Sequence, residues 1–574
     1  MTEHPAGSAP SSELDILLAE SGRLEKLGDS NGVRQLALRY LTRHPHDPAA
    51  LVLLGRAELL LDRPARALAP LARSARLTDQ FVFHLLHADC LKRLDRIQEQ
   101  HEALEKAAHR MPHSGSAYFM AGIAFEGISD TERALRFYHQ ALEMMPEEAS
   151  LHHRLGRLLI AKGEVQNALA HLERALAQKP DNPVYLVDYS VALEHAGQLD
   201  KALAAVEKAL IHMPNNREAL HNRGHLLFNL NRSHEALTVF DAAEQDGLAT
   251  PKSRFSRGVT LLKLGHFKEG WEGYEARWGM SQTYPAHLPA PLWQGESLAG
   301  RALLLHAEQG FGDSLQFIRF AAQLALQGAI ITALVPPELQ RLFESVVGIA
   351  HSVSVLPANA QFDFHCPLAS LPHRLGITPH NIPANPYFSV PPDEALQQGG
   401  AIRRLMWSRN TVAKRVVGLV WAGAPRPTQF EAHAIDQRRS MPITALEPLL
   451  ETPDTVFVSF QMRGRRQITT AGLPIVDGTE GIKDFADTAA RLLGIDLLIS
   501  VDTSIVHLAG GLGLPVWMLS RFDGCWRWME NRSDTPWYPT MRIFRQPQLN
   551  DWNGLLQLVT KALGEFSPAV QPVL

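Results

Sequence analysis

Residues 146–180 read PEEASLHHRLGRLLIAKGEVQNALAHLERALAQKP, and this stretch decides the fold of the N-terminal half. It runs from one proline to another 34 residues on, and the same interval separates Pro112, Pro146, Pro180 and Pro214. Self-similarity of this length indicates a stack of helical hairpins, because one hairpin cannot bury its own apolar face and needs its neighbours. The stretch therefore predicts an all-α solenoid.

Small residues recur with the same period at positions where two antiparallel helices approach closely. Four columns are present: Gly122, Gly156, Gly224 and Gly258; Ala134, Ala168, Ala202 and Ala236; Ala141, Ala175, Ala209 and Ala243; Gly163, Gly197 and Gly265. The glycines of the last column fall where the first helix of a unit must end, and each proline ends the second helix. The columns resemble the tetratricopeptide repeat, most specifically over 79–248, more weakly over 14–78 and fading after 249. We expect about seven or eight units within 14–282.

The concave surface of such a solenoid is lined mainly by first helices and is the expected binding surface. On the register above, the polar residues that these helices offer are His153, Arg157, Asp188, His221, Asn222 and His225. We expect this groove to bind a protein or peptide.

Composition excludes several classes of protein. With 574 residues the chain has room for several cores, and its formal net charge of −4 without a basic stripe argues against nucleic-acid binding. Three scattered cysteines, Cys90, Cys366 and Cys525, form neither a metal-ligand pair nor a disulfide framework, which favours a reducing, cytoplasmic location. We expect residues 1–13 to be a disordered tail without a secretory signal. No apolar run approaches the roughly 18 residues of a transmembrane segment.

The second half of the chain has a different pattern, in which short apolar runs alternate with segments of helical periodicity. We place strands at 302–306, 330–335, 416–421, 456–460, 497–501 and 516–519. This alternation is typical of parallel α/β units. A polar stretch near 391–413 separates two groups, so we expect two α/β lobes, at 283–400 and 401–574, with ligands beyond the carboxyl ends of their strands.

A first motif, AEQGFGDS at 307–314, follows the first of these strands and precedes a helix expected to begin near Leu315. Its two glycines allow a tight turn and a close approach of a ligand to the backbone. Asp313 has two interpretations. It either caps the helix, for which aspartate is a favoured residue, or presents its carboxylate to a ligand.

A second motif, SVDTSIVHLAGGLGLP at 500–515, joins a hydrophobic strand to a helix. Asp502, Thr503 and Ser504 stand at the turn, and His507 follows one helical turn later. The free N–H groups and hydroxyls of such a helix N-terminus suit a phosphate. An ordinary capped helix with a packed histidine would give the same pattern.

Together the two motifs resemble those of the heptosyltransferase-like glycosyltransferases (family nine), which have two Rossmann-like lobes in the GT-B arrangement. The resemblance extends over about 293–560 and implies an α/β GT-B domain after the solenoid. It implies that Asp313 is a catalytic aspartate and that the second motif holds a nucleotide-sugar donor. The residues implied in donor binding are Asp502, Thr503, Ser504, His507, Gly423 and Arg426. Glu308, Gln309, Gly310 and Gly312 would contact the acceptor or shape the loop.

The chain departs from that family in two places. Ser504 stands where the family usually has glycine, and the lysine expected after Gly423 is missing, so that Arg426, Arg438 or Arg439 would supply its charge. The absence of an Asp-x-Asp pair favours a reaction without metal. With Asp313 as the base that the resemblance implies, we expect the reaction to be inverting, and we expect no cofactor besides the nucleotide-sugar co-substrate. The tryptophans of 526–537 either pack between elements or stack on a sugar or base.

The combination of repeats with such a domain resembles protein O-glycosyltransferases, including the bacterial flagellin glycosyltransferases. It implies transfer of a sugar to Ser or Thr of an acceptor protein that the repeats recruit, which is an argument by analogy. Two alternatives remain: elongation of a lipopolysaccharide or another glycan, and a non-catalytic scaffold with a degenerate transferase fold. The sequence leaves the donor sugar, the nucleotide and the oligomeric state open.

Overall fold

The computed structural model describes residues 12–280, 288, 290–308, 310–409, 413–426 and 430–568. The chain divides into two compact units, Met1–Asp188 and Tyr189–Leu574. The division lies within the helical array and not at 282/283, where the sequence predicts the end of the solenoid. Of the predicted tail, residues 1–11 lie outside the described residues, and the first helix begins at Glu13.

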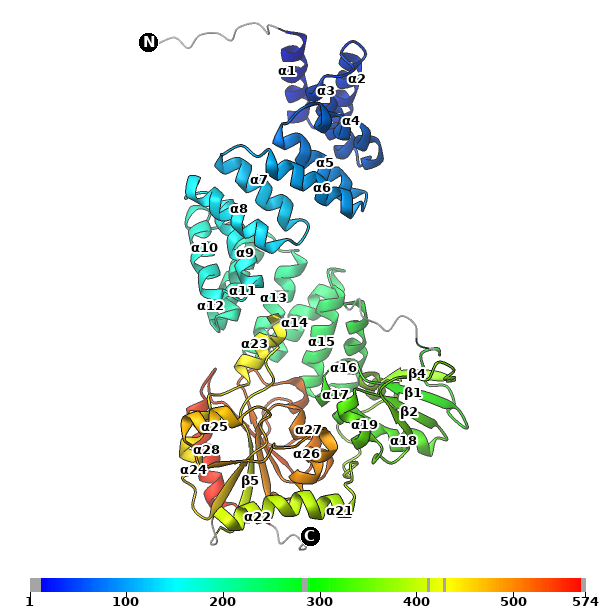
Figure 1. The fold of residues 1–574 in the computed structure, drawn as a ribbon, viewed down its shortest axis with the longest axis vertical. Helices are drawn as coiled ribbons and strands as arrows, with labels where there is room; N and C mark the ends of the chain where they lie inside the picture. Colours follow the sequence, from blue (N-terminus) through cyan, green and yellow to red (C-terminus); the bar gives the residue numbers. More distant parts are fainter. Residues whose placement is uncertain are drawn as a thin grey trace. The chain divides into compact units, whose positions relative to one another are not determined.

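The first unit is built from paired antiparallel helices, visible in blue to cyan in Figure 1. These helices are α1 Glu13–Lys26, α2 Ser30–Leu41, α3 Pro48–Leu60, α4 Pro64–Leu77, α5 Phe81–Arg93, α6 Ile97–His109, α7 Gly115–Glu126, α8 Thr131–Met144, α9 Ala149–Ala161 and α10 Val165–Gln178. Helix α11, Pro183–His195, crosses the division. In the second unit the array continues with α12 Leu199–His212, α13 Arg217–Asn229, α14 Ser233–Gln245, α15 Pro251–Leu264 and α16 Phe267–Tyr274, followed by the 3₁₀ turn η1 Glu275–Gly279.

The repeat columns have the packing roles that their spacing predicts. A Cβ atom on Gly156 of α9 would lie 2.6 Å from Cγ of Leu172 on α10, so only glycine permits this helix contact. Pro180 follows the end of α10 by two residues, as the closing prolines are expected to do. The turn inside each hairpin uses a left-handed residue: Gly28, Asp62, Asp95, Ser129, Gly163, Gly197, Asn231 and Gly265. The period is therefore encoded in backbone conformation as well as in packing.

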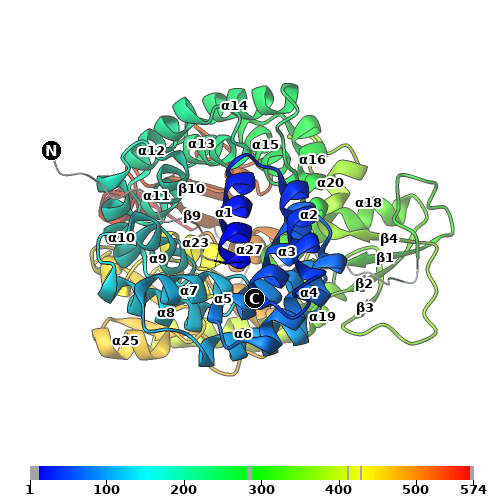
Figure 2. The same ribbon diagram turned by 90° about the horizontal axis from the view of Figure 1, so that it is seen from above.

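Two parallel sheets follow the array. The smaller sheet belongs to what we term the first lobe, whose elements are β1 Ala302–His306, α17 Phe311–Phe317, η2 Ile318–Phe320, α18 Ala321–Leu326, β2 Ile330–Leu334, α19 Pro337–Phe343, β3 Ile349–Val353, β4 Phe364–Pro367, η3 Leu368–Ser370 and α20 Leu371–Arg374. Its strand order is β3-β2-β1-β4, and Figure 2 shows these strands side by side. The helical segment α21 Pro392–Glu394 and η4 Ala395–Gly399 leads to the second lobe.

The second lobe contains the larger sheet. Its elements are α22 Gly400–Arg409, β5 Arg415–Val420, α23 Phe430–Arg438, η5 Ile443–Leu446, α24 Glu447–Leu450, β6 Thr455–Ser459, α25 Arg465–Ala471, β7 Ile475–Asp477, α26 Phe485–Leu492, β8 Leu497–Val501, α27 Ser504–Gly511, β9 Val516–Ser520, η6 Trp526–Trp528, β10 Met541–Arg545 and α28 Trp552–Glu565. The strand order is β10-β9-β8-β5-β6-β7, the doubly wound order in which the strand sequence reverses between β5 and β8.

Both faces of the larger sheet are covered, which explains why its central strands are continuous apolar runs. Val417 and Leu419 of β5 pack in one core with Leu555 and Leu556 of α28. Their neighbours in the strand point to the opposite face, where the core includes residues of α26 and α27. Figure 1 shows α26 and α27 on one side of β5, and α24 and α28 on the other.

The last repeats are built into the α/β part of the second unit. The ammonium of Lys263 on α15 is 1% exposed and lies 3.3 Å from a carboxylate oxygen of Glu530. The Trp271 indole of α16 donates a hydrogen bond of 3.0 Å to the carbonyl of Ile377. A buried lysine is stable only with such partners, so these repeats and the lobes stabilise one another. None of the described helices has both the length and the apolar character needed to cross a membrane.

Candidate functional site

The two sequence motifs lie at the reversal points of the two sheets. In the smaller sheet the order reverses between β1 and β4, and the helix that follows β1 carries Asp313 in its first turn. In the larger sheet it reverses between β5 and β8, and the loops after these strands carry Gly423 and Asp502–Ser504. Ligands of open parallel sheets bind at such crevices, so both motifs occupy the positions that topology favours for a ligand.

Asp313 is not the cap of its helix. Helix α17 begins at Phe311, earlier than the expected start near Leu315, and Gly310 occupies the N-cap position with φ 80°. Asp313 therefore lies in the first turn, where its carboxylate accepts a hydrogen bond from Nη2 of Arg527 in η6. Its side chain is 35% exposed. Burial raises the pKa of the Asp313 carboxyl above its ordinary value, and the charge of Arg527 opposes that rise.

Helices α17 and α27 meet at their N-termini and join the two lobes. A Cβ atom on Gly312 would lie 3.2 Å from Cδ2 of His507 and 3.8 Å from Cα of Ser504. Glycine at position 312 thus allows the backbone of the first motif to lie directly on the second motif. The side chain of Asp502 is near enough to Asp313 to raise the pKa of that carboxyl. The structure therefore places the two predicted motifs together.

His507 has the environment of a packed histidine. It is buried, its Nδ1 lies 2.9 Å from the hydroxyl of Tyr538, and its ring stacks on Trp528 with centroids 5.5 Å apart. Burial, with the charges of Arg527 and Arg319, lowers the pKa of His507 well below its ordinary value. The imidazole is therefore neutral and supports the contact between the motifs, and it offers no positive charge to a phosphate.

The tip of α27 is partly exposed and has an arginine beside it. Thr503 is the N-cap residue, with extended backbone, and Ser504 begins the helix. Nη1 of Arg439 donates a hydrogen bond of 2.9 Å to the carbonyl of Asp502, immediately before the tip. The first N–H groups of any helix lack intrahelical partners, so a positive charge and free donors are combined here.

Of the three arginines considered for the missing lysine, Arg439 is the one at this tip. The guanidinium of Arg426 is 44% exposed and is held by two hydrogen bonds to Asp436, of 2.8 and 2.9 Å. Arg438 pairs instead with the buried Asp523. Gly423 packs directly on Arg439, because a Cβ atom there would lie 2.6 Å from its Nε.

The remaining residues of the first motif shape the loop. Both carboxylate oxygens of Glu308 accept hydrogen bonds of 2.9 Å from Arg277 in η1, which connects the loop to the end of the repeat array. Gly310 adopts a left-handed conformation that begins α17. Gln309 lies outside the described residues. Glu308 is thus occupied by an arginine within the chain.

The predicted groove residues are divided between the two units. In the first unit His153 lies on α9, with Nε2 at 2.5 Å from Oδ2 of Asp188 on α11, and its ring stacks on Tyr185. In the second unit Nε2 of His225 lies 3.1 Å from Oε1 of Glu194.

His221 and Asn222 lie beside His225 on α13, a first helix of the array. Burial lowers the pKa of His221 to about 3. Arg157 of α9 pairs with Glu126 of α7. Several predicted groove side chains therefore bind the neighbouring repeat.

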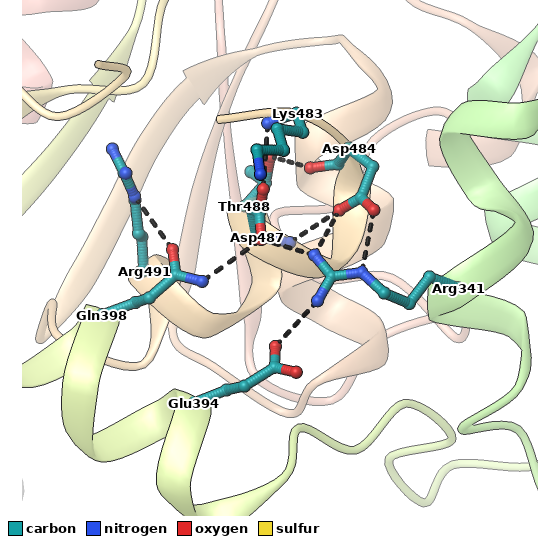
Figure 3. Close-up of polar contacts among 8 residues, drawn as sticks. All are labelled: Arg341, Glu394, Gln398, Lys483, Asp484, Asp487, Thr488 and Arg491. Atoms are coloured by element: carbon teal, nitrogen blue, oxygen red, sulfur yellow. Dashed lines mark hydrogen bonds and ion pairs between the residues drawn. The ribbon is translucent and has the colours of Figure 1, made fainter. Parts of the chain in front are cut away.

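A second contact between the lobes is made by Arg341 of α19, which the sequence analysis did not single out. Its Nε and Nη2 donate hydrogen bonds of 2.8 and 2.7 Å to Asp484, and Nη1 donates one of 3.0 Å to Glu394. Figure 3 shows this guanidinium reaching the acidic residues at the start of α26, including Asp487. A cavity of about 620 Å³ lies beside it, lined by Arg341, Leu342, Glu344, Ser345, Ser389, Val390, Pro391, Pro392, Glu394 and Ala486. The cavity contains no residue of either motif.

The tryptophans near 530 pack between elements, as one of the two interpretations predicts. Trp526, Trp528 and Trp537 are each at most 5% exposed. Sequence reasoning also assigned no role to Arg527, which lies between two of these tryptophans and is the partner of Asp313. An arginine flanked by two apolar aromatic residues was the available signal, since a charge placed in such a run requires a buried partner.

Comparisons with known proteins identify the repeats. Residues 24–80 and 129–186 match family models described as tetratricopeptide repeat. The repeat family predicted from the columns is therefore confirmed for the N-terminal half, and such repeats are protein-interaction modules.

The chain is similar to Protein FlbA of Caulobacter vibrioides, with 27% identity over 383 residues, 61% of this chain and 62% of that protein. The chain thus spans less than two thirds of that relative. Solved structures with similar folds include a tetratricopeptide repeat protein from Parabacteroides merdae (14% identity, 42% of this chain and 94% of that one, TM-score 0.37). Another is YrrB, described as a TPR protein with an unusual peptide-binding site (18% identity, 32% and 96%, TM-score 0.28).

Proposed function

We propose that the protein is a glycosyltransferase that moves a sugar from a nucleotide-sugar donor to a Ser or Thr hydroxyl of an acceptor protein held by its repeats. The observation that carries this proposal is the direct contact between the N-termini of α17 and α27. It brings the motif that carries Asp313 against the first turn of a helix at the reversal point of a doubly wound sheet. A proton acceptor beside an anion-binding helix is the pair of groups that sugar transfer from a nucleotide requires.

The donor half of the proposed site is the reversal point of the larger sheet. Nucleotides bind to doubly wound sheets at this crevice, with their phosphates at a helix N-terminus. Here that helix is α27, preceded by Thr503 and flanked by Arg439. As the bond between the sugar and the phosphate breaks, negative charge grows on the leaving oxygen. The N–H groups of the first turn and the guanidinium of Arg439 would stabilise that charge.

The acceptor half is the carboxylate of Asp313. In the proposed reaction it accepts the proton of an acceptor hydroxyl, whose oxygen attacks the anomeric carbon. The nucleotide leaves from the opposite face with the electron pair of the broken bond, so the configuration at that carbon inverts. The raised pKa of Asp313 suits this role, because a base is most effective when its pKa approaches the working pH.

The repeats supply the argument for a protein acceptor. Tetratricopeptide repeats present a concave surface to polypeptides, and the last of them are packed directly against the lobes. Transfer to flagellin is the specific form of this proposal that the resemblance implies. The argument for flagellin is an analogy between domain combinations.

The proposal is tested with the full-length protein and its Asp313→Asn variant. A thermal-unfolding screen against nucleotide sugars should identify a donor that stabilises both proteins, by about 2.7 kcal/mol at a hundredfold excess over its dissociation constant. Transfer or donor hydrolysis by Asp313→Asn should fall at least about tenfold, because a positioned base contributes roughly 10²–10⁴-fold. Asp534→Asn, a change at a carboxylate that is 69% exposed, is the matched control.

Full activity of Asp313→Asn would remove this residue from the mechanism. If no nucleotide sugar stabilises the protein, that result would count against the whole proposal.

Mass spectrometry of cellular proteins after gene deletion identifies the acceptor class. An unchanged set of glycoproteins would exclude a protein acceptor.

A further inference from the structure

We propose that Arg527 is a positioning residue of this site, which reaches from the second lobe to hold the carboxylate of Asp313 ionised and oriented for proton transfer. The part of this inference that concerns proton transfer rests on the proposed function. The contact itself is a property of the structure and is testable without any reaction.

The guanidinium of Arg527 binds two side chains on one face of α17. Its Nη2 donates to Oδ1 of Asp313, and its Nε donates to Oε1 of Gln316 at 2.6 Å. The two acceptors are three residues apart and therefore lie on the same side of the helix. The planar fork of an arginine matches such a pair, whereas the single ammonium of a lysine does not.

Arg527 is itself held rigidly. Its guanidinium lies over the ring of Trp526 with 4.4 Å to the centroid, and its side chain is 12% exposed. Trp526 packs edge-on against Trp271 of the last repeat, with centroids 5.2 Å apart. A buried guanidinium requires a counter-charge, and Asp313 supplies it. The arginine is therefore fixed by the repeats and the second lobe while its partner belongs to the first lobe.

This arrangement leaves one oxygen of Asp313 for a substrate. Oδ1 is occupied by Arg527, while the Asp313 side chain as a whole remains 35% exposed. Oδ2 lies 3.4 Å from the position that a Cβ atom would take on Gly310, so the glycine keeps space open beside it. Arg527 would thus fix which oxygen faces an acceptor hydroxyl.

The charges around Asp313 determine how a change at Arg527 should act. Burial raises the pKa of Asp313, Arg527 and Arg277 lower it, and Asp502 raises it. The titratable groups facing it are Arg527 on η6, Arg277 on η1, Asp502 after β8 and Tyr274 on α16, and His507 on α27 lies against the adjacent Gly312. Among these charges, Arg527 opposes the effect of burial on the pKa of Asp313 most strongly. Its removal should raise the pKa of Asp313 and leave more of the carboxyl protonated at neutral pH.

The direct test is a pH titration of Asp313 in the full chain. The titration is monitored by ¹³C NMR of protein whose aspartates are labelled at Cγ, and the Asp313 signal is assigned as the one that is lost in Asp313→Asn. Arg527→Met should move the midpoint to higher pH, and Arg527→Lys should move it less. Arg532→Met is the matched control, because Arg532 pairs with Asp534 on the same segment and should leave the midpoint unchanged. Arg527→Gln keeps a donor without the charge and replaces Arg527→Met if the latter does not fold.

The second readout is the pH dependence of transfer. In Arg527→Met, the acid limb of the plot of transfer rate against pH should move to higher pH by the same amount as the midpoint of the Asp313 titration. The rate of transfer at neutral pH should fall at least about tenfold. A merely structural role for Arg527 would lower the rate without moving the limb. An unchanged midpoint in a folded Arg527→Met or Arg527→Gln protein overturns the inference, whatever the activity. A shifted midpoint in a protein that transfers no sugar leaves the ion pair established and removes the proposed function instead.

Discussion

At the scale of the residue, the structure indicates Arg439 as the side chain that would contact the phosphates of a bound donor. It donates to the carbonyl of Asp502 at the tip of α27 and also pairs with Asp436, which is the partner of Arg426 as well. Arg439→Ala should weaken nucleotide binding about tenfold or more, because a hydrogen bond to a charged group contributes about 1.5–3 kcal/mol. Isothermal titration with UDP, GDP, ADP and CMP in parallel measures this. Arg426→Ala, the control, should change affinity little, and equal losses in both variants would contradict the assignment.

The residues of the site were predictable from sequence only where they follow a strand. Asp313 and Thr503 lie in the segments that follow β1 and β8, and the carboxyl ends of parallel strands are where ligands bind. Arg527 is 214 residues from Asp313, and no local pattern encodes a contact of that separation. For His507 the sequence left two interpretations open, a packed residue and a donor contact, because its neutral state follows from burial against Trp528 and not from its position on a helix.

At the scale of the element, the helix hairpin of the last repeat tests whether packing or local preference determines the array. A Cβ atom on Gly258 of α15 would lie 2.6 Å from the backbone nitrogen of Tyr274 on α16. Gly258→Ala should therefore destabilise the second unit by about 1–3 kcal/mol, since backbone cannot move aside as a side chain can. Thermal unfolding measures the loss. In Gly564→Ala, the matched helical control, the Cβ atom meets nothing within 4 Å, so stability should be unchanged or slightly higher. Equal stability of the two variants would refute the packing argument.

The strands that sequence analysis found and missed differ in their place in the sheets. All six predicted strands are central, in the order β2-β1 of the smaller sheet and β9-β8-β5-β6 of the larger one. The missed strands β3, β4, β7 and β10 are the four edges. A central strand is buried on both faces and reads as a continuous apolar run, whereas an edge strand is short or mixed, as in the three residues of β7. The pattern of apolar residues in the sequence therefore indicates which strands are buried. It indicates strand pairing only indirectly, because the strands that pair on both sides are also the buried ones.

At the scale of the whole molecule, the last repeats share a hydrophobic core with the α/β part across the boundary that the sequence suggests near residue 282. The change near residue 282, from helical repeats to alternating strands and helices, marks the end of the repeat helices. It does not mark the limit of the hydrophobic core that these helices share with the lobes. Trp271 of α16 is 1% exposed and packs with Phe317 of the first lobe and Trp537 of the second. Such long-range packing cannot be predicted from a period of 34 residues, because the repeat pattern specifies only contacts between neighbouring units.

A fragment of residues 283–574 should consequently fail to fold, whereas residues 183–574, which begin with the whole of α11, should form a stable unit. The shorter fragment would expose the aromatic surfaces that Trp271 and Phe267 cover, and would leave Glu530 without the buried ammonium of Lys263. Circular dichroism, gel filtration and thermal unfolding of the two fragments measure this difference. Full-length protein is the reference for the unfolding temperature of the second unit. A cooperative, monodisperse 283–574 fragment would show that the lobes form an autonomous domain and that the last repeats are only attached to it.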